Sequence, residues 1–243
     1  MINAEEVART SGFRELKDRI VALSFDLENP VVADIGSGTG LLTLALADRA
    51  QKVWAIDISE RMADYLRAKS SSAGFANVET VVASAVSLPL VDDSVDIVVS
   101  NYCYHHLSDD DKRRAISEAF RVLRPGGRFV FGDMMFSVSV VDPRDRELLA
   151  SKIRSISSRG IPGLARIVKN AARYATGRWE KPARSDWWAS ALADAGFTDV
   201  RVEPLEHEGG FAAAICPSDS DKVYRPLRDC SEIEIAEPIA ARG

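Results

Sequence analysis

Glycines recur at every second position in one segment, Gly36, Gly38 and Gly40, directly after an apolar run that contains Asp34. Glycine lets the backbone turn tightly and approach a ligand closely, and the amides that open a following helix offer unpaired donors. A dinucleotide fingerprint would carry its third glycine at position 41, where this chain has Leu41. A carboxylate beside such a turn suits a ligand that is cationic at one end. The predicted ligand contacts in this segment are Asp34, Gly36, Ser37, Gly38 and Gly40.

Titratable side chains follow other apolar runs of the chain. Asp57 ends the run at residues 52–57, where its two oxygens are placed to accept both hydroxyls of a ribose. His105 and His106 follow the run at 95–100, and Asp133 ends the run at 128–133. An imidazole at a strand end can orient a substrate or accept its proton. These three side chains are therefore candidate catalytic groups, and Tyr102 and Tyr104 are expected to wall the same pocket.

His207 is a fourth candidate, because it follows the predicted strand at 198–203. If this strand runs parallel to the others, its carboxyl end lies on the ligand side of the sheet, and Glu206, His207 and Glu208 border the substrate mouth. A solvated hairpin turn is the competing interpretation.

The apolar runs alternate with segments of helical periodicity, a pattern that predicts a doubly wound α/β fold with a mostly parallel sheet covered on both faces. Ser59 is expected to cap a helix, and the segment 124–127 is expected to end a helix and turn into a strand. The expected strands are 31–35, 52–57, 78–82, 95–100 and 128–133, then a pair at 198–203 and 210–216. The expected helices begin after Asn3 and cover 40–50, 59–74, 108–123 and 187–195.

Composition narrows the function classes. The chain of 243 residues, 46% hydrophobic, suffices for one substantial domain, and its net charge of -5 disfavours a nucleic-acid partner. Cys103, Cys216 and Cys230 are widely spaced, which indicates neither a disulfide framework nor a thiolate metal site, and no metal is expected. The charged N-terminal segment and the lack of a long apolar run predict a cytoplasmic protein without stable membrane insertion.

One segment departs from this acidic average. Residues 144–184 contain eleven Lys or Arg and three Asp or Glu, a balance of +8 that leaves -13 for the remainder. Arg166, Lys169 and Arg173 share one side of a predicted helix there. We expect a helical lid insertion at about 137–185 that selects an anionic or amphiphilic acceptor or touches a membrane surface transiently. An ordinary covering helix with a solvated face is the alternative. The expected division is an N-terminal helical segment (1–30), a domain (31–216) with this insertion, and a polar tail (217–243).

Four blocks together resemble the class I methyltransferases that depend on S-adenosylmethionine (SAM), in the group that includes the ubiquinone/menaquinone methyltransferases. Asp34-Ile-Gly-Ser-Gly-Thr-Gly40 is similar to the first motif of this family, and Asp57 ends the second strand as the family requires. The block from Val82 to Leu90 precedes Val95-Asp-Ile-Val-Val-Ser-Asn101, and Leu123-Arg-Pro-Gly-Gly127 enters the fifth strand. The order and spacing of these blocks carry the resemblance.

The resemblance implies a Rossmann-like sheet with an antiparallel final strand and SAM as the cofactor. Ile58 and Met62 would then cover the adenine, Ala85 would contact the ring through its amide, and Ser84 stands where the family usually has an acidic residue. Asn101 would belong to the same cofactor site. His106 matches a histidine that recurs in the family, and His105 is its more variable neighbour.

The function predicted from these features is methyl transfer to a small-molecule acceptor by in-line displacement. An oxidoreductase that uses NAD and a catalytically inactive SAM-binding protein are the alternatives. The segment Asn101-Tyr-Cys-Tyr104 lacks the two prolines that accompany methylation of nucleic-acid bases in this superfamily, which agrees with the absence of a nucleic-acid partner.

Overall fold

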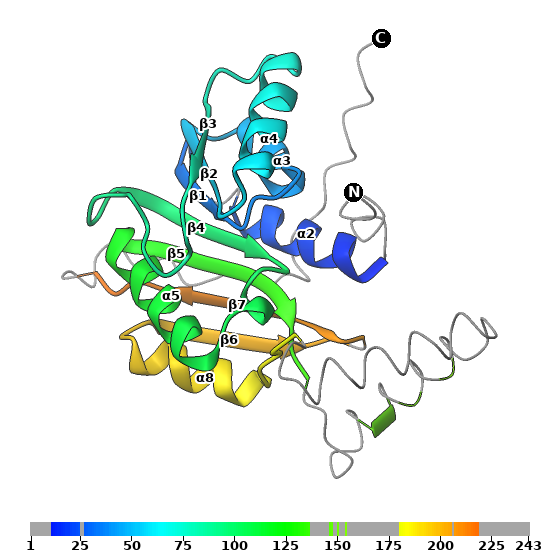
Figure 1. The fold of residues 1–243 in the computed structure, drawn as a ribbon. Helices are drawn as coiled ribbons and strands as arrows, with labels where there is room; N and C mark the ends of the chain where they lie inside the picture. Colours follow the sequence, from blue (N-terminus) through cyan, green and yellow to red (C-terminus); the bar gives the residue numbers. More distant parts are fainter. Residues whose placement is uncertain are drawn as a thin grey trace.

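The fold is described by a computed structural model for residues 11–24, 27–136, 146, 147, 150, 154, 180–205 and 207–218. A seven-stranded sheet with the order β3-β2-β1-β4-β5-β7-β6 forms its centre (Figure 1). β1 to β5 are parallel, whereas β7 runs antiparallel to both β5 and β6. The strands are β1 (Val31–Ile35), β2 (Lys52–Asp57), β3 (Val78–Val82), β4 (Val95–Asn101), β5 (Leu123–Met134), β6 (Thr198–Pro204) and β7 (Gly209–Ile215). The doubly wound α/β fold with an antiparallel final strand is confirmed.

Helices cover both faces of the sheet. Leu16, Ile20 and Leu23 of α2 are buried against one face together with residues of α3, so α2 belongs to the core of the domain. On the opposite face, Phe129 and Phe131 of β5 pack in a second core cluster with residues of α5 and α8. The helical elements are α2 (Ser11–Ser24), α3 (Leu41–Ala47), α4 (Glu60–Ser72), the 3-10 turn η1 (Tyr104–His106), α5 (Asp109–Val122) and α8 (Ser185–Asp194).

The chain reverses its direction of travel across the sheet between β1 and β4. It runs outward from β1 to β2 and β3, then crosses back to place β4 on the other side of β1. Such a switch point opens a crevice at the carboxyl ends of the strands, because the two following loops turn away from each other. The residues after β1 and β4 therefore meet at the natural ligand site of the fold.

Local capping determines the helix boundaries. Ser59 caps α4 as predicted, and Ser108 caps α5; each side chain accepts a hydrogen bond from the backbone amide three residues on. The expected helix at 40–50 was too long: α3 covers only Leu41–Ala47. Gly40 has a φ of +83°, which is left-handed and lies outside the helical region, so the helix can begin only at Leu41.

The segment 124–127 forms an irregularity within β5. Pairing with β4 shifts from Val95 opposite Leu123 to Ile97 opposite Arg128, so the segment between bulges out of the ladder. A Cβ at Gly127 would lie 2.8 Å from the Arg124 carbonyl oxygen, so only glycine fits there. α5 ends before this segment, as predicted, but β5 begins at Leu123 and not at the expected residue 128.

Several sequence predictions lie outside the described residues. They are the helix start after Asn3, most of the insertion at about 137–185 and the tail beyond residue 218. Within the described part of the chain, no helix is long and apolar enough to cross a bilayer.

Candidate functional site

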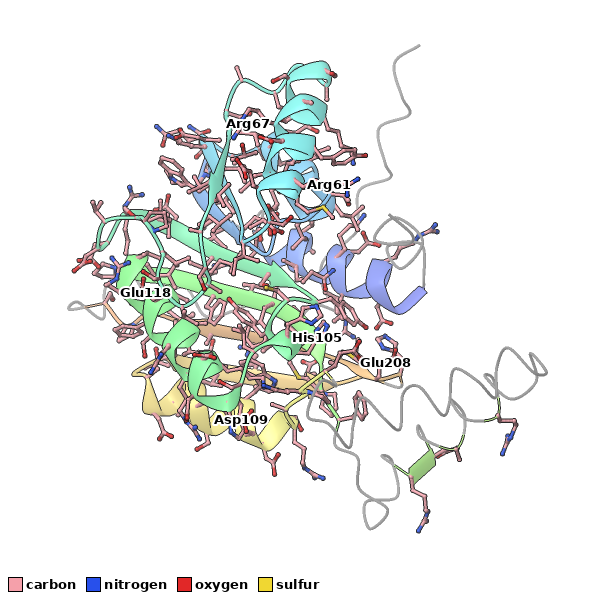
Figure 2. The ribbon with its side chains drawn as sticks, in the orientation of Figure 1. Arg61, Arg67, His105, Asp109, Glu118 and Glu208 are labelled. Carbon is pink, nitrogen blue, oxygen red and sulfur yellow. The ribbon has the colours of Figure 1, made fainter. Side chains whose placement is uncertain are left out.

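The carboxyl edge of the sheet gathers nearly all of the candidate residues. The turn after β1 carries the three glycines, β2 ends at Asp57, and β4 ends at Asn101. β6 runs in the same direction as β5, because both pair antiparallel with β7. His207 therefore follows β6 at the same edge, and Figure 2 shows its neighbour Glu208 at the same end of the sheet as His105. The residues predicted to bind the cofactor and the titratable side chains therefore lie at the same edge of the sheet.

The three glycines of the turn have left-handed backbones but different surroundings. A Cβ at Gly36 would overlap Cys103 Sγ, and a Cβ at Gly40 would overlap Leu66 Cδ1, so these two glycines permit close packing. At Gly38 the nearest atom to a Cβ would be the Gly36 carbonyl oxygen at 3.8 Å. Gly38 is therefore the glycine that borders open space, as close approach of a ligand requires.

Asp57 ties the glycine turn to the start of α4. Its Oδ2 accepts a hydrogen bond of 2.9 Å from the Gly38 amide, and its Oδ1 accepts one of 2.8 Å from the Ser59 amide. A carboxylate offers about four lone-pair sites, so each oxygen retains capacity for a further donor such as a hydroxyl. Asp57 has both a structural role and the geometry expected of a ribose contact.

Asp34 is buried beneath the turn. Its side chain accepts a hydrogen bond of 2.5 Å from the Thr43 hydroxyl of α3. Burial raises the pKa of Asp34 to about 7, opposed by hydrogen bonds from Thr43 and reinforced by the nearby charge of Asp57. The group therefore changes charge near neutral pH, and a cation bound beside the turn would favour its ionised form.

Two buried polar side chains at the switch point have no hydrogen-bond partner among the described residues. They are the Ser37 hydroxyl and both polar atoms of the Asn101 amide, and these residues are only 7% and 8% exposed. Leaving such groups unpaired costs about 1 to 3 kcal/mol each. A polar ligand in the crevice would satisfy them, so these residues, the open side of Gly38 and the spare capacity of Asp57 all fit SAM.

The remaining predicted cofactor residues follow β2 and β3 at the same carboxyl edge of the sheet. Ile58 follows Asp57 and is 76% exposed, so its side chain is accessible to a ligand. Met62 stands in the first turn of α4 and is half-buried. Ser84 and Ala85 lie in a tight turn after β3, in which the Ser87 amide donates to the Ser84 carbonyl.

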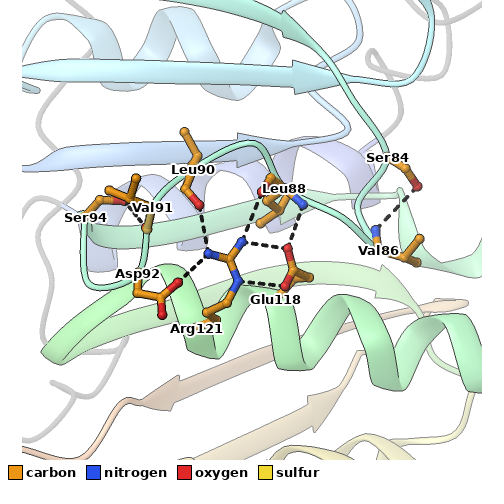
Figure 3. Close-up of polar contacts among 9 residues, drawn as sticks. All are labelled: Ser84, Val86, Leu88, Leu90, Val91, Asp92, Ser94, Glu118 and Arg121. Carbon is orange, nitrogen blue, oxygen red and sulfur yellow. Dashed lines mark hydrogen bonds and ion pairs between the residues drawn. The ribbon is translucent and has the colours of Figure 1, made fainter.

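An ion-pair network fixes the segment that follows Ser84 and Ala85 (Figure 3). The Arg121 guanidinium donates to the carbonyls of Leu88 and Leu90 and to the Asp92 carboxylate. Glu118, bound to the same guanidinium, accepts a hydrogen bond of 2.7 Å from the Leu88 amide. α5 therefore holds the loop between β3 and β4 in one conformation, which determines the place of the turn at Ser84.

His105 and Asp133 form a buried pair at the ends of β4 and β5. His105 Nδ1 lies 2.6 Å from Asp133 Oδ1, and the His105 backbone amide donates to Asp133 Oδ2 over 2.8 Å. Asp133 has no exposed surface and His105 is 6% exposed. Burial lowers the pKa of His105, but the charge and hydrogen bond of Asp133, together with Glu180, raise it above the usual 6.5. With Nδ1 directed at the carboxylate, Nε2 is the nitrogen left to exchange a proton.

The structure distinguishes the two neighbouring histidines. His106 belongs to the same 3-10 turn but is exposed, and its ring centroid lies 4.0 Å from that of His105. The family resemblance pointed to His106, whereas the buried carboxylate holds His105. Tyr104, expected to wall the pocket, lies instead in the core between Phe131 and Trp188, so that expectation was wrong. A 3-10 turn rotates successive side chains by about 120°, so adjacent residues face different surroundings.

Tyr102 and His207 line the same edge on the side of α2. Tyr102 has a φ of +55°, an uncommon and strained conformation for a bulky residue, and its ring meets the His105 ring edge-on. Burial raises the pKa of Tyr102, as do the charges of Glu208, Asp133 and Glu15. Backbone strain of this kind clusters at functional sites.

His207 contacts α2 through Glu15, which the sequence did not indicate as a site residue. His207 Nδ1 accepts a hydrogen bond of 2.9 Å from the Gly209 amide, and its Nε2 lies 3.6 Å from Glu15 Oε2. Nothing in the local sequence of α2 distinguishes Glu15 from other surface carboxylates. Its place at the site follows from the packing of α2 on the sheet.

The described residues hold no cluster of side chains that could ligate a metal ion, and their thiols are protonated. No group of three or more His, Cys, Asp or Glu side chains is arranged there to hold a metal ion. Within this part of the chain Cys103 and Cys216 are free thiols, and burial raises the pKa of Cys103 to about 12, so its thiol stays protonated.

Comparison with known proteins gives concordant results. Residues 32–127 match the model of a methyltransferase domain. The chain is 31% identical over 190 residues to the ubiquinone/menaquinone biosynthesis C-methyltransferase of Vibrio parahaemolyticus, covering 75% of this chain and 69% of that protein. It is also 31% identical to an uncharacterized methyltransferase of Geobacillus kaustophilus, and the match spans 61% of this chain but only 64% of that protein's length.

Solved structures show the same fold. A SAM-dependent methyltransferase from Aquifex aeolicus superposes with a TM-score of 0.60 at 21% identity, covering 87% of this chain and 96% of that one. The YcgJ protein of Bacillus subtilis gives a TM-score of 0.60 at 18% identity, covering 84% and 99%.

Proposed function

Since the chain belongs to the class I SAM-dependent methyltransferases, we propose that it moves a methyl group from SAM to a small-molecule acceptor and that His105 accepts the acceptor's proton. The observation that carries the second part is the 2.6 Å contact between His105 Nδ1 and Asp133 Oδ1 at the carboxyl edge. SAM supplies a methyl group on a positively charged sulfur. Because methyl transfer leaves this sulfur as a neutral thioether, the leaving group needs no acid. The protein's task is therefore orientation, exclusion of water and removal of a proton from the acceptor.

The cofactor residues would divide the ligand between them. Asp57 would accept hydrogen bonds from the ribose hydroxyls. Gly38, which has no side chain, would let the ligand approach the backbone of the turn closely, and Ile58 and Met62 would cover the adenine. Ser84 and the Ala85 amide face the edge of the ring. Asp34, Ser37 and Asn101 stand near the cationic amino-acid end, with Gly36 and Gly40 supporting the turn from behind. The unpaired atoms of Ser37 and Asn101 support this assignment, since a ligand would supply the partners that they lack among the described residues.

The proton step uses the His105–Asp133 pair. The carboxylate holds the imidazole with Nδ1 protonated, so that the Nε2 lone pair can accept a proton from the O–H, N–H, S–H or C–H of the acceptor. The imidazolium that forms is stabilised by the adjacent negative charge of Asp133. The acceptor leaves with the methyl group, and the proton passes from Nε2 to solvent. His106 and His207 border this position and would orient the acceptor.

The acceptor class is proposed from charge. The +8 balance of residues 144–184 supports an anionic or amphiphilic small molecule, and this segment lies mostly outside the described residues. Joint neutralisation of Arg166, Lys169 and Arg173 tests the point. The Michaelis constant for the acceptor should rise and its salt dependence should flatten, with SAM affinity unchanged. Unaltered kinetics at low and high salt would assign these charges to a solvated surface.

Titration calorimetry with SAM, S-adenosylhomocysteine and NAD tests the cofactor, and transfer of radiolabelled methyl groups to a panel of small anionic and neutral acceptors tests the reaction. Tighter binding of NAD than of SAM would contradict the proposal. Binding of SAM without transfer to any acceptor, in water or with vesicles present, would favour the inactive SAM-binding protein instead.

A further inference from the structure

α5 begins three residues after the catalytic turn and carries a lysine that has no contact with solvent. The Lys112 side chain is 0% exposed, whereas the next residue, Arg113, has a side chain that is 56% exposed. An ammonium group loses its hydration on burial, and the loss is unfavourable unless close partners replace the water. A methionine would fill similar space without this penalty, so the presence of a charge here calls for an explanation.

The contacts of the ammonium link the catalytic turn to the helix. Lys112 Nζ donates a hydrogen bond of 3.0 Å to the Leu107 carbonyl and one of 2.9 Å to Asp109 Oδ1. Leu107 is the residue that closes η1, since its amide donates to the Tyr104 carbonyl over 2.9 Å. The lysine therefore attaches the end of the turn that carries His105 to the first turn of α5.

The same charge acts on His105 through space. Burial lowers the pKa of His105 and the charge of Lys112 lowers it further, against the raising effects of Asp133 and Glu180. The Lys112 side chain is fully buried, so water screens its charge little, and the ion pair with Asp109 offsets part of that charge. The titratable and charged groups around His105 in the described structure are Asp133 on β5, Lys112 on α5, Glu180 and Lys181 before α8, and Tyr102, Cys103 and His106 on its own segment.

We propose that Lys112 is a positioning residue for His105, which holds the turn Tyr104–His106 at the carboxyl edge and keeps the imidazole available in its neutral form. The proposal rests on the assigned role of His105 as the proton acceptor. It explains a buried cation that holds the end of the turn carrying a buried histidine-aspartate pair: the anion orients the ring, and the cation, together with burial, opposes the preference of that anion for the protonated ring.

The test compares Lys112→Met with Arg113→Met, a matched loss of one cation from the adjacent, exposed position of the same helix. Nuclear magnetic resonance of the His105 ring protons as a function of pH reads the imidazole directly, with no need for turnover. In Lys112→Met we expect His105 to titrate at higher pH than in the wild type, and in Arg113→Met at the wild-type pH. The acidic limb of kcat/KM should move with the titration, and SAM affinity should stay within twofold.

Two further variants keep the test independent of folding defects. Lys112→Gln removes the charge but keeps a donor and should also shift the titration upward, whereas Lys112→Arg keeps the charge and should restore the wild-type value. An unshifted His105 in folded Lys112→Met or Lys112→Gln would overturn the proposal, as would an equal shift in Arg113→Met. A shifted titration in a protein that transfers no methyl group would sustain the link between Lys112 and His105 and contradict the proposed function instead.

Discussion

His105 Nδ1 and Asp133 Oδ1 lie 2.6 Å apart although 28 residues separate them in the chain. The contact exists because β4 and β5 are parallel neighbours whose carboxyl ends meet, with Asn101 opposite Gly132 in the register. A carboxylate at the end of one strand thereby holds an imidazole in the turn after the other. The same carboxylate also binds the His105 amide, so both the ring and its backbone are fixed.

Loss of the carboxylate should impair catalysis more than binding. Asp133→Asn leaves the shape of the site but removes the charge that orients and stabilises the imidazolium, so kcat should fall about 10²-fold or more, with SAM affinity changed less than twofold. His105→Gln should lower kcat by a similar factor, whereas His106→Gln should retain most of the activity. Steady-state kinetics measure kcat, and calorimetry measures SAM affinity. A greater loss of kcat in His106→Gln than in His105→Gln would assign the proton-accepting role to His106.

The rate should depend on pH through His105. Because Asp133 and Glu180 raise the pKa of His105 above 6.5 against the effect of burial, the neutral, proton-accepting imidazole predominates only above that higher pH. kcat/KM should therefore increase with pH as His105 loses its proton and level off once His105 is deprotonated. A pH–rate profile of the wild type against His105→Gln measures this, and a flat wild-type profile would argue against a proton-accepting role.

Removal of the Asp57 carboxylate should weaken the cofactor complex. With two ribose hydroxyl bonds lost, Asp57→Ala should bind SAM about 2 to 4 kcal/mol more weakly by calorimetry. Some loss of stability should accompany it, since Asp57 also bonds the Gly38 and Ser59 amides. Asp96→Ala is the control: that carboxylate bonds the Val31 amide but lies at the amino end of β4. Equal SAM affinity in both variants would make Asp57 purely structural.

A side chain at Gly38 should block the ligand. Gly38→Val places a branched group in open space beside the glycine turn, so SAM binding should be lost while the fold persists. Gly74→Val is the control for backbone strain without a blocked site. Gly74 lies after α4, has a φ of +83°, and has no atom within 4 Å of the position that a Cβ would take. Circular dichroism and calorimetry on both variants separate the two effects. Normal SAM binding by Gly38→Val would exclude the glycine turn from the site.

Asp34→Asn should raise the stability of the fold and lower its affinity for SAM. The folded-state pKa of about 7 exceeds the usual 3.8, so wild-type stability falls as pH rises between these values, when only the unfolded state ionises readily. An amide does not ionise, so the variant should gain about 2 to 4 kcal/mol in unfolding free energy relative to the wild type at pH 8, and little at pH 4. Urea unfolding at both pH values measures the gain. The same variant should bind cationic SAM more weakly, and an equal gain at both pH values would contradict the burial of the charge.

The sequence by itself determined the order of strands and helices, because each depends on short-range patterns. The apolar run at residues 31–35 gave β1 its bounds, and Ser59 and Ser108 marked two helix starts through hydrogen bonds that span only three residues. The glycine spacing and the position of Asp57 likewise predicted a cofactor site at one edge of the sheet, since strand ends in a parallel sheet share one edge.

Only the tertiary structure decided which histidine meets Asp133, which glycine borders open space and which residue of α2 reaches His207. Adjacent residues such as His105 and His106 are equivalent in a linear pattern, but the rotation of a 3-10 turn directs one toward the neighbouring strand and the other outward. The contacts of Gly36 with Cys103 and of Glu15 with His207 join residues that are far apart in the chain. Such contacts depend on strand register and helix packing, which are set by the burial of the whole core and not by any local segment.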